Sequence, residues 1–411
     1  MSTDAKTPMI DVAKLPIEQG VSKLVSYALM LPASDIFFSE DGSSLTVSVR
    51  HFGIINPIAI VPREVGRKFV SHVKAMAGMD LAEKRRPQDG RWLFQSEPGR
   101  VVDLRVNMVP TLHGEDIALR ILTNNATLYK IDELGLTKDQ LGELTGMLAS
   151  PGGLILFTGP TGSGKTATMY ASLTRLNDGR RKINTIEDPV EHAIDGIRQS
   201  QINPQIDVGF SLLLRNVLRQ SPDVVMLGEI RDSETAETAV RAANSGHLVL
   251  ATIHAPIAAG AIQSMRGLGV HPHFLATSLL GILSQRLVRT LCKECKMDFD
   301  LSMAPNTFAE VRPWLAPDEG KKLYAAKGCP TCQNLGYGGR TGVFEVLRIN
   351  RRRRDLISDA RPTREIRDAA ISDKMLNFRQ AALLKVAQGV TSTEEVFRVI
   401  PSEHLLQETL V

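Results

Sequence analysis

The sequence predicts an α/β protein built around a mainly parallel sheet. Short apolar runs that read as strands alternate with stretches of helical periodicity in residues 149–290. Strands separated by helices pair in parallel, and ligands bind at the carboxyl ends of such strands. Four of the apolar runs end in polar or glycine residues of the kind that bind ligands. They are Leu154–Thr158, Lys182–Ile186, Val224–Leu227 and His247–Ile253.

A glycine-rich loop follows the first of these strands. Gly159–Thr166 fits the phosphate-loop pattern G-x-x-x-x-G-K-[ST], and a helical stretch, Ala167–Leu173, comes directly after it. That strand–loop–helix context argues against the alternative of a chance glycine-rich turn. Backbone N–H groups can converge on phosphates at the positive end of the helix. Lys165 is expected to reach the β- and γ-phosphates, and the Thr166 hydroxyl to hold Mg²⁺.

The sequence therefore predicts a nucleoside-triphosphate site. The expected nucleotide-binding residues are Gly159, Pro160, Thr161, Gly162, Ser163, Gly164, Lys165, Thr166 and Ala167.

Two carboxylates are expected at the same edge of the sheet. Glu229 follows Gly228, at a position where many phosphate-loop enzymes place a metal-binding Asp before a catalytic Glu. Glycine cannot ligate a metal, so we expect Glu229 to orient the attacking water; the alternative is a solvated loop carboxylate. Glu187 is the second candidate, as an organiser of water or of the metal shell. For Asp188, which precedes Pro189, helix capping and catalysis both stay open.

Two histidines lie at the ends of the fourth predicted strand. His247 and His254 are seven positions apart, so alternation along a strand aims them at opposite faces. Only His254 lies at the carboxyl end, where a γ-phosphate would be sensed. We expect His254 to act at the site, and His247 to have a structural or interface role.

The four cysteines form two C-x-x-C pairs, and 33 residues separate the pairs. Four thiolates in two such pairs match a closed tetrahedral Zn²⁺ site. A redox role is the alternative, but no thioredoxin-like βαβ pattern surrounds either pair. The expected zinc ligands are Cys292, Cys295, Cys329 and Cys332.

Composition places the chain among soluble globular proteins. It has 411 residues, a net charge of +4, 43% hydrophobic and 23% charged residues. No apolar run approaches the ~20 residues that span a bilayer, and Met1–Lys6 does not begin a secretory signal. These features predict a cytosolic protein. The run Arg351–Arg354 is interpreted as a solvated or inter-subunit face rather than as a nucleic-acid or anionic-lipid site.

Residues 1–130 are predicted to form a separate α/β domain. A helix is expected over residues 21–29, and strands over residues 45–50, 101–108 and 116–122. Asp89-Gly90 suggests a hairpin turn between residues 85 and 92.

Together these motifs resemble the secretion and pilus ATPase superfamily, and within it the type II secretion and type IV pilus assembly motors. The matching stretches, in the family's order along nearly the whole chain, are Gly159–Thr166 (Walker A), Thr185–Glu191 (aspartate box), Gly228–Asp232 (Walker B), Gly246–His254 (histidine box), Gln285–Arg289 and Gly336–Gly342. The tetracysteine region resembles the assembly branch, because the retraction motors lack it. Longer assembly members carry an additional N-terminal docking domain that this sequence does not match.

The resemblance implies a division of the chain into five parts. They are an N-terminal α/β (PAS-like) domain (1–130), a linker (131–148), a RecA-like ATPase core (149–290), a tetracysteine zinc subdomain (291–345) and a helical C-terminal region (346–411). It also implies that the first domain supplies arginines to the nucleotide, and Arg91, Arg105 and Arg120 lie in the corresponding stretches. Ordinary surface salt bridges are the alternative for these side chains.

The function that the resemblance implies is a homo-hexameric, Mg²⁺-dependent ATPase at the cytoplasmic face of the inner membrane. It would drive a polytopic platform protein that adds subunits to a pilus or pseudopilus. A DNA-transfer motor ranks second, because only 5% of the residues are aromatic and no basic stripe is evident. A nucleotide-binding scaffold that does not cycle is the third hypothesis, since Ala255-Pro256 replaces the family's usual residues after His254.

Overall fold

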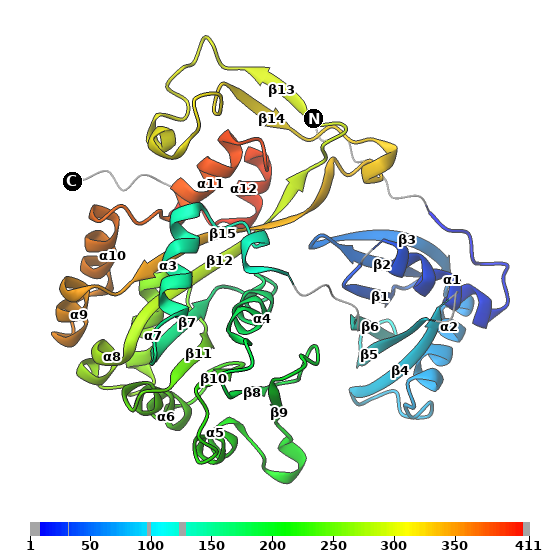
Figure 1. Cartoon of the computed structure of the whole chain (residues 1–411). Coiled ribbons are helices and arrows are strands. Elements are labelled where there is room, and N and C mark those ends of the chain that lie inside the picture. The colour runs from blue at the N-terminus through cyan, green and yellow to red at the C-terminus, as the bar shows by residue number, and fades with distance from the viewer. Residues whose placement is uncertain (1–8, 32, 97–99, 123–128, 406–411) are drawn as a thin grey trace. The chain divides into compact units, whose positions relative to one another are not determined.

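The computed structural model describes residues 9–31, 33–96, 100–122 and 129–405. The chain divides into two compact units (Figure 1). The first unit comprises Met1–Ala126 with Lys327–Gly336, and the second comprises Thr127–Ala326 with Tyr337–Val411. Within the described ranges, no helix has both the length and the apolar character that a membrane span requires.

The first unit is an antiparallel sheet covered on one face by two helices. Its strands run in the order β3-β2-β1-β6-β5-β4. Apolar side chains alternate along the strands and pack under α1 (Ile17–Met30) and α2 (Arg63–Met76), so that one sheet face is buried and the other is exposed. The strands are β1 (Asp35–Glu40), β2 (Ser44–His51), β3 (Ile54–Pro62), β4 (Gln88–Ser96), β5 (Arg100–Pro110) and β6 (Glu115–Leu122).

The hairpin turn predicted at Asp89-Gly90 is wrong. Both residues lie inside β4, where Gly90 pairs with Val106 of β5. A Cβ atom at Gly90 would lie 2.4 Å from the carbonyl oxygen of Ala77, which follows α2. Glycine is therefore used for close approach of two backbone segments, and not for a turn.

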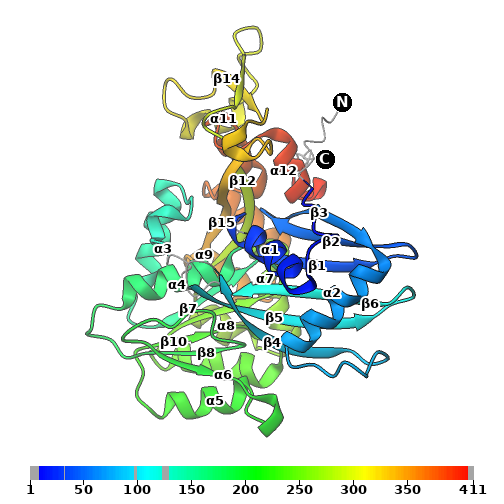
Figure 2. The same cartoon turned by 90° about the vertical axis from the view of Figure 1, so that its right-hand side faces the viewer.

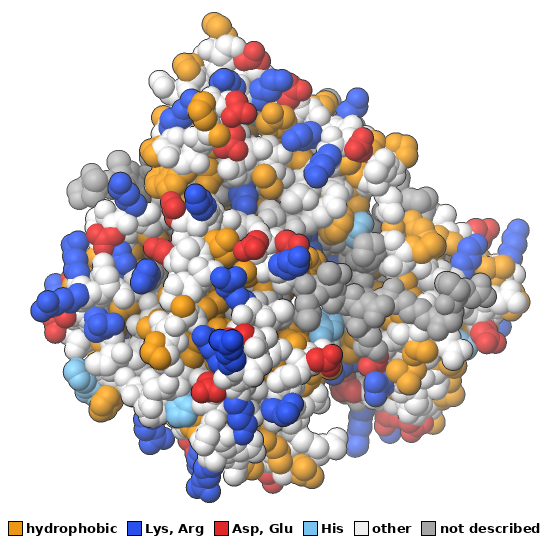
Figure 3. All heavy atoms as spheres, viewed as in Figure 1, with side chains coloured by type: hydrophobic (Ala, Val, Ile, Leu, Met, Phe, Trp, Pro, Cys, Tyr) orange, Lys and Arg blue, Asp and Glu red, His pale blue; other side chains and the backbone are white. Residues whose placement is uncertain are grey.

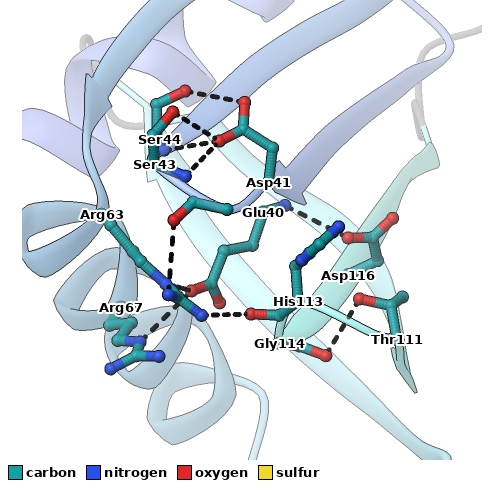
Figure 4. A network of polar contacts seen from close by, with 11 residues as sticks. Glu40, Asp41, Ser43, Ser44, Arg63, Arg67, Thr111, His113, Gly114 and Asp116 are labelled. Carbon is teal, nitrogen blue, oxygen red and sulfur yellow. Dashed lines mark hydrogen bonds and ion pairs between the residues drawn. The ribbon is translucent and has the colours of Figure 1, made fainter.

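A buried carboxylate fastens α2 to the sheet of the first unit. Glu40 Oε1 accepts hydrogen bonds from Arg63 Nε at 2.7 Å and Arg67 Nε at 3.2 Å. Arg63 also donates to the carbonyl oxygen of His113 at 2.7 Å, in the turn between β5 and β6 (Figure 4). The contacts join the end of β1, the start of α2 and this turn.

The second unit contains a seven-stranded sheet in the order β15-β12-β7-β11-β10-β8-β9. All neighbours pair in parallel except β12 and β15, which confirms the predicted mainly parallel sheet. The strands are β7 (Gly153–Thr158), β8 (Ile183–Glu187), β9 (Arg198–Gln201), β10 (Val224–Leu227), β11 (Leu248–Ile253), β12 (Leu279–Leu291) and β15 (Tyr337–Arg348).

Helices cover both faces of this sheet (Figure 1). One face packs against α3 (Lys138–Leu148) and α4 (Lys165–Leu176). The opposite face packs against α5 (Phe210–Leu218), α6 (Ser233–Asn244), α7 (Ala258–Gly267) and α8 (Pro272–Ser278), extended by α9 (Arg351–Ser358) and α10 (Thr363–Ser372). Because both faces are covered, the central strands β7 and β11 are buried throughout their length and mostly apolar.

The long strands β12 and β15 extend beyond the rest of the sheet. Their extension packs against α11 (Phe378–Ala387) and α12 (Thr393–Val399). Two short strands, β13 (Met297–Asp300) and β14 (Lys322–Ala325), form a small antiparallel pair, and β14 lies beyond α11 (Figure 2). Short 3₁₀ helices span Ile131–Glu133, Pro204–Ile206, Ala309–Trp314, Pro330–Cys332 and Ser402–His404.

Candidate functional site

The phosphate loop joins β7 to α4, as predicted. Gly159 and Gly164 have φ angles of 141° and 90°, in the region that glycine adopts most easily. A Cβ atom at Gly159 would lie 2.4 Å from the carbonyl oxygen of Gln285, so no larger residue fits there. These two positions give the loop the curvature that a phosphate cradle requires.

The lysine of the loop lies within its curve. Lys165 Nζ donates hydrogen bonds to the carbonyl oxygens of Gly159 at 2.9 Å and Pro160 at 3.0 Å. Burial lowers the pKa of Lys165, and the nearby negative charge of Glu229 opposes this shift. Thr166, in the first turn of α4, is exposed. An ammonium group and an accessible hydroxyl are the side chains that a phosphate and a hard cation need here.

Glu229 and His254 lie together at the carboxyl edge of the sheet. Glu229 follows β10 and His254 follows β11, and His254 Nε2 lies 3.8 Å from Glu229 Oε2. Arg231 forms an ion pair with the other oxygen of Glu229, and its Nη1 atom lies 3.7 Å from Asp188 Oδ2. The pairing with Glu229, partly opposed by burial, raises the pKa of Arg231.

Glu187, at the end of β8, is surrounded by hydrogen-bond donors. Its side chain is buried, and it accepts hydrogen bonds from the Tyr170 hydroxyl, from Thr185 Oγ1 and from Gln199 Nε2. Burial, with a further contribution from Glu187, raises the pKa of Tyr170. Donors saturate this carboxylate on several sides, so its contacts tie β8 and β9 to α4.

His247 contacts the end of the preceding helix. Its Nδ1 atom lies 3.0 Å from the carbonyl oxygen of Ala242 and 3.1 Å from Ser245 Oγ. His254, in contrast, is 62% exposed at the carboxyl edge. The two histidines thus flank β11, and His254 lies at the carboxyl end of the strand, as expected.

The three predicted arginines form a row across the exposed face of the first unit's sheet. Arg105 on β5 is the cross-strand neighbour of both Arg91 on β4 and Arg120 on β6. Arg91 forms a two-pronged ion pair with Asp103, at 3.0 and 2.8 Å. Arg120 faces Asp35 across β1 and β6. Arg105 has a like charge on either side, an arrangement that disfavours the fold and suits the binding of an anion.

The four cysteines lie together. Their sulfur atoms are all within 4.8 Å of one another, and the Sγ atoms of Cys329 and Cys332 are 3.7 Å apart. Two sulfurs of a tetrahedral zinc site with ~2.3 Å Zn–S bonds lie about 3.8 Å apart. The donor set and its spacing therefore fit Zn²⁺.

A family profile described as type II/IV secretion system protein matches residues 11–398. The chain belongs to this family. A relative within it, "Type II secretion system ATPase E" of Vibrio cholerae, is 42% identical over 384 residues, which cover 93% of this chain and 75% of the relative. "Type IV pilus assembly ATPase PilB" of Acinetobacter baylyi is 38% identical and covers 93% of this chain and 66% of the relative.

Solved structures agree on the fold. The DotB ATPase of Legionella pneumophila superimposes with a TM-score of 0.69 at 20% identity, covering 95% of this chain and 97% of that one. The α/β fold expected from the resemblance to secretion-system proteins is thereby confirmed.

Three residues of the site were not expected from the sequence. Tyr170 binds Glu187, Arg231 binds Glu229, and Gln285 donates to the phosphate loop. Arg231 and Gln285 lie within stretches that already carry the likeness to the secretion-system family, which is the one signal that could have singled them out. Tyr170 sits on an ordinary helical stretch, so only the packing of α4 against β8 reveals it.

Proposed function

We propose that this chain is an ATP-hydrolysing motor of a type II secretion or type IV pilus assembly machine. The named relatives support this proposal, since they are ATPases of those two systems. The observation that carries it is the grouping of a phosphate loop with Glu229 and His254 at one edge of a parallel sheet. Phosphoryl transfer needs phosphate binding and a group that orients water within reach of each other.

Nucleotide binding starts at the phosphate loop. Phosphate oxygens take the place of the Gly159 and Pro160 carbonyl oxygens at Lys165 Nζ, because an anion attracts the ammonium more strongly than a neutral carbonyl does. Backbone N–H groups of the loop and of the first turn of α4 bind the remaining oxygens. The Thr166 hydroxyl would hold Mg²⁺, and the ion would neutralise negative charge on the β- and γ-phosphates.

Glu229 orients the attacking water in the proposed hydrolysis. It can do so only after Arg231 moves from the carboxylate oxygen with which it is paired. Arg231 then becomes available to the developing phosphoryl charge. His254 is exposed beside Glu229 and senses the γ-phosphate. Glu187 acts indirectly, because Tyr170, Thr185 and Gln199 already occupy its oxygens.

Arg91, Arg105 and Arg120 are proposed to bind the nucleotide from the N-terminal domain of a neighbouring copy. Arg105 and Arg120 are the stronger candidates, because Asp103 already engages the guanidinium of Arg91. This role implies a ring of identical subunits, for which we propose six. We also propose the division of the chain into five parts that the resemblance to secretion and pilus ATPases implies.

The four cysteines would hold Zn²⁺ in a structural role. Four thiolates leave no open coordination position for chemistry. The site would fix the end of β12, since Cys292 directly follows that strand.

The proposed partner is a polytopic platform protein at the cytoplasmic face of the inner membrane. Among the described residues on the face drawn in Figure 3, basic and acidic side chains intermingle. That distribution suits a protein partner better than the continuous basic groove of a nucleic-acid track.

The test is a pair of variants measured for binding and for turnover. Lys165→Ala should abolish binding of Mg-ATP, and Glu229→Gln should retain binding while phosphate release falls by at least about 100-fold. Retained hydrolysis in Glu229→Gln, or unchanged binding in Lys165→Ala, contradicts the proposal. Added duplex DNA should leave the turnover of the unaltered protein unchanged.

A further inference from the structure

We infer that Gln285, on β12, is a positioning residue that sets the orientation of the phosphate loop; its effect on nucleotide affinity rests on the proposed function. β12 pairs in parallel with β7, the strand that leads into the loop, with Ser284 opposite Thr158. Gln285 is the next residue and lies where β7 gives way to the loop. Its Nε2 atom donates a 2.8 Å hydrogen bond to the carbonyl oxygen of Ser163.

Gln285 meets the loop at three points. The first contact is the side-chain hydrogen bond to Ser163. In the second, the backbone oxygen of Gln285 lies 2.4 Å from the position that a Cβ atom of Gly159 would take. Its Nε2 atom lies 3.1 Å from the corresponding position at Gly164. The loop therefore packs against a single residue of the neighbouring strand. Glycines at positions 159 and 164 allow this close approach because they have no Cβ atom.

The hydrogen bond is shielded from water. Gln285 is 1% exposed and Ser163 3% exposed. Gln285 Oε1 and Ser163 Oγ are buried, and neither has a hydrogen-bond partner within the part of the chain that the structure describes. Burying such polar atoms is costly, and an apolar side chain of similar size would avoid the cost at position 285. The presence of glutamine thus indicates that its amide donor is needed at this position.

The donor fixes the direction of one peptide group. The Ser163 carbonyl and the Gly164 N–H belong to the same planar trans peptide, so they point in opposite directions. When Gln285 holds the carbonyl, the N–H is kept on the other side. A carbonyl turned toward a phosphate would repel it, whereas an N–H attracts it. Gly164, at a φ of 90°, offers little resistance to rotation of this peptide by itself.

The experiment compares Gln285→Met with a matched control, Gln140→Met. Gln140 on α3 is also a buried glutamine, but its Nε2 atom donates a 2.8 Å hydrogen bond to the carbonyl oxygen of Phe344 on β15 and not to a carbonyl of the loop. Both variants replace a buried amide by an apolar chain of similar length. Gln285→Glu, which keeps the shape but loses the donor, serves as a second variant if Gln285→Met does not fold.

The first readout is amide hydrogen exchange of the nucleotide-free protein. We expect faster exchange in a peptide that covers residues 159–167 for Gln285→Met and Gln285→Glu, and no change there for Gln140→Met. Equal exchange in all variants, or an increase spread over the whole second unit, overturns the inference. This readout does not need nucleotide, so it decides the positioning role even if the protein is not an ATPase.

The second readout is the dissociation constant of a fluorescent ATP analogue. The Gln285 variants should bind up to about tenfold more weakly than the unaltered protein, and Gln140→Met within about twofold of it. Unchanged affinity in the Gln285 variants overturns the effect on the nucleotide. Localised exchange together with no binding by the unaltered protein supports the positioning role and contradicts the proposed function.

Discussion

The Tyr170 hydroxyl donates a hydrogen bond to the buried carboxylate of Glu187. Tyr170 lies on α4, the helix that begins at the phosphate-loop lysine, and Glu187 ends β8. The same hydroxyl accepts a 3.2 Å hydrogen bond from the backbone N–H of Glu191. One side chain thus links the loop helix, a strand end and the segment that follows it.

Tyr170→Phe should lower the free energy of unfolding by about 1–2 kcal/mol, because it leaves the buried Glu187 carboxylate and the Glu191 N–H with fewer hydrogen bonds. It should also slow ATP hydrolysis, since α4 is no longer held to the end of β8 by the hydrogen bond between Tyr170 and Glu187. Tyr337→Phe is the control, because the Tyr337 hydroxyl lies 2.8 Å from Ser392 Oγ in a buried position on β15. Urea unfolding and phosphate release measure the two effects. Equal slowing by both variants speaks against a specific link to the site.

Arg105→Gln should stabilise the first unit and impair turnover at the same time. Removing the central charge relieves repulsion from Arg91 and Arg120, which is worth a few tenths of a kcal/mol. Turnover should fall much more than nucleotide binding if the guanidinium acts on the developing phosphoryl charge. Thermal unfolding, binding and phosphate release are measured on one preparation. Loss of stability without loss of turnover would assign Arg105 a purely structural role.

Purified protein should contain about one zinc per chain. Cys292→Ser and Cys329→Ser should each lower that content, because each removes one of the four clustered sulfurs. A chelator should lower the midpoint of thermal unfolding, since metal binding is coupled to folding of the ligand segments. Metal analysis that finds well under one zinc per chain in freshly prepared protein rejects the site.

Lys385 should make stability depend on pH. Its ammonium donates a 2.6 Å hydrogen bond to the carbonyl oxygen of Gly135, and burial lowers its pKa from 10.5 to about 8. Between these two pH values the unfolded chain binds more protons at Lys385 than the folded chain does. The contribution of Lys385 to the free energy of unfolding therefore increases as pH rises from 8 to 10.5.

The measurement is urea unfolding of the unaltered protein and of Lys385→Met at pH 8 and at pH 9.5. The increase with pH should be smaller in Lys385→Met by up to about 1.4 kcal/mol per pH unit. Lys138→Met, at an exposed position on α3, should behave like the unaltered protein. Identical pH dependence in all three proteins contradicts this account of Lys385.

Local patterns in the sequence predicted the parallel sheet and the phosphate loop well. The apolar runs that end in Thr158, Leu227 and Ile253 are strands over nearly the predicted residues. They could be predicted because buried parallel strands are apolar on both faces and polar only where they end. Glu229 and His254 could be brought together on the same grounds.

Features that depend on packing between distant segments were not predictable. Asp89-Gly90 has the composition of a turn, but the proximity of Ala77 determines its role. Arg353 lies in a charge run interpreted as a solvated or inter-subunit face, yet it is buried. It donates to the Arg348 carbonyl at 2.6 Å and to Asp373 at 2.7 Å. The donors around Glu187 likewise come from three separate elements.

We propose an ATPase whose site is completed between copies of the chain. Its most direct test is phosphate release from Mg-ATP at increasing protein concentration, with Glu229→Gln as the control. We predict that activity per chain rises with concentration and that Glu229→Gln releases at least about 100-fold less phosphate. Activity per chain that is independent of concentration, or that persists in Glu229→Gln, would contradict it.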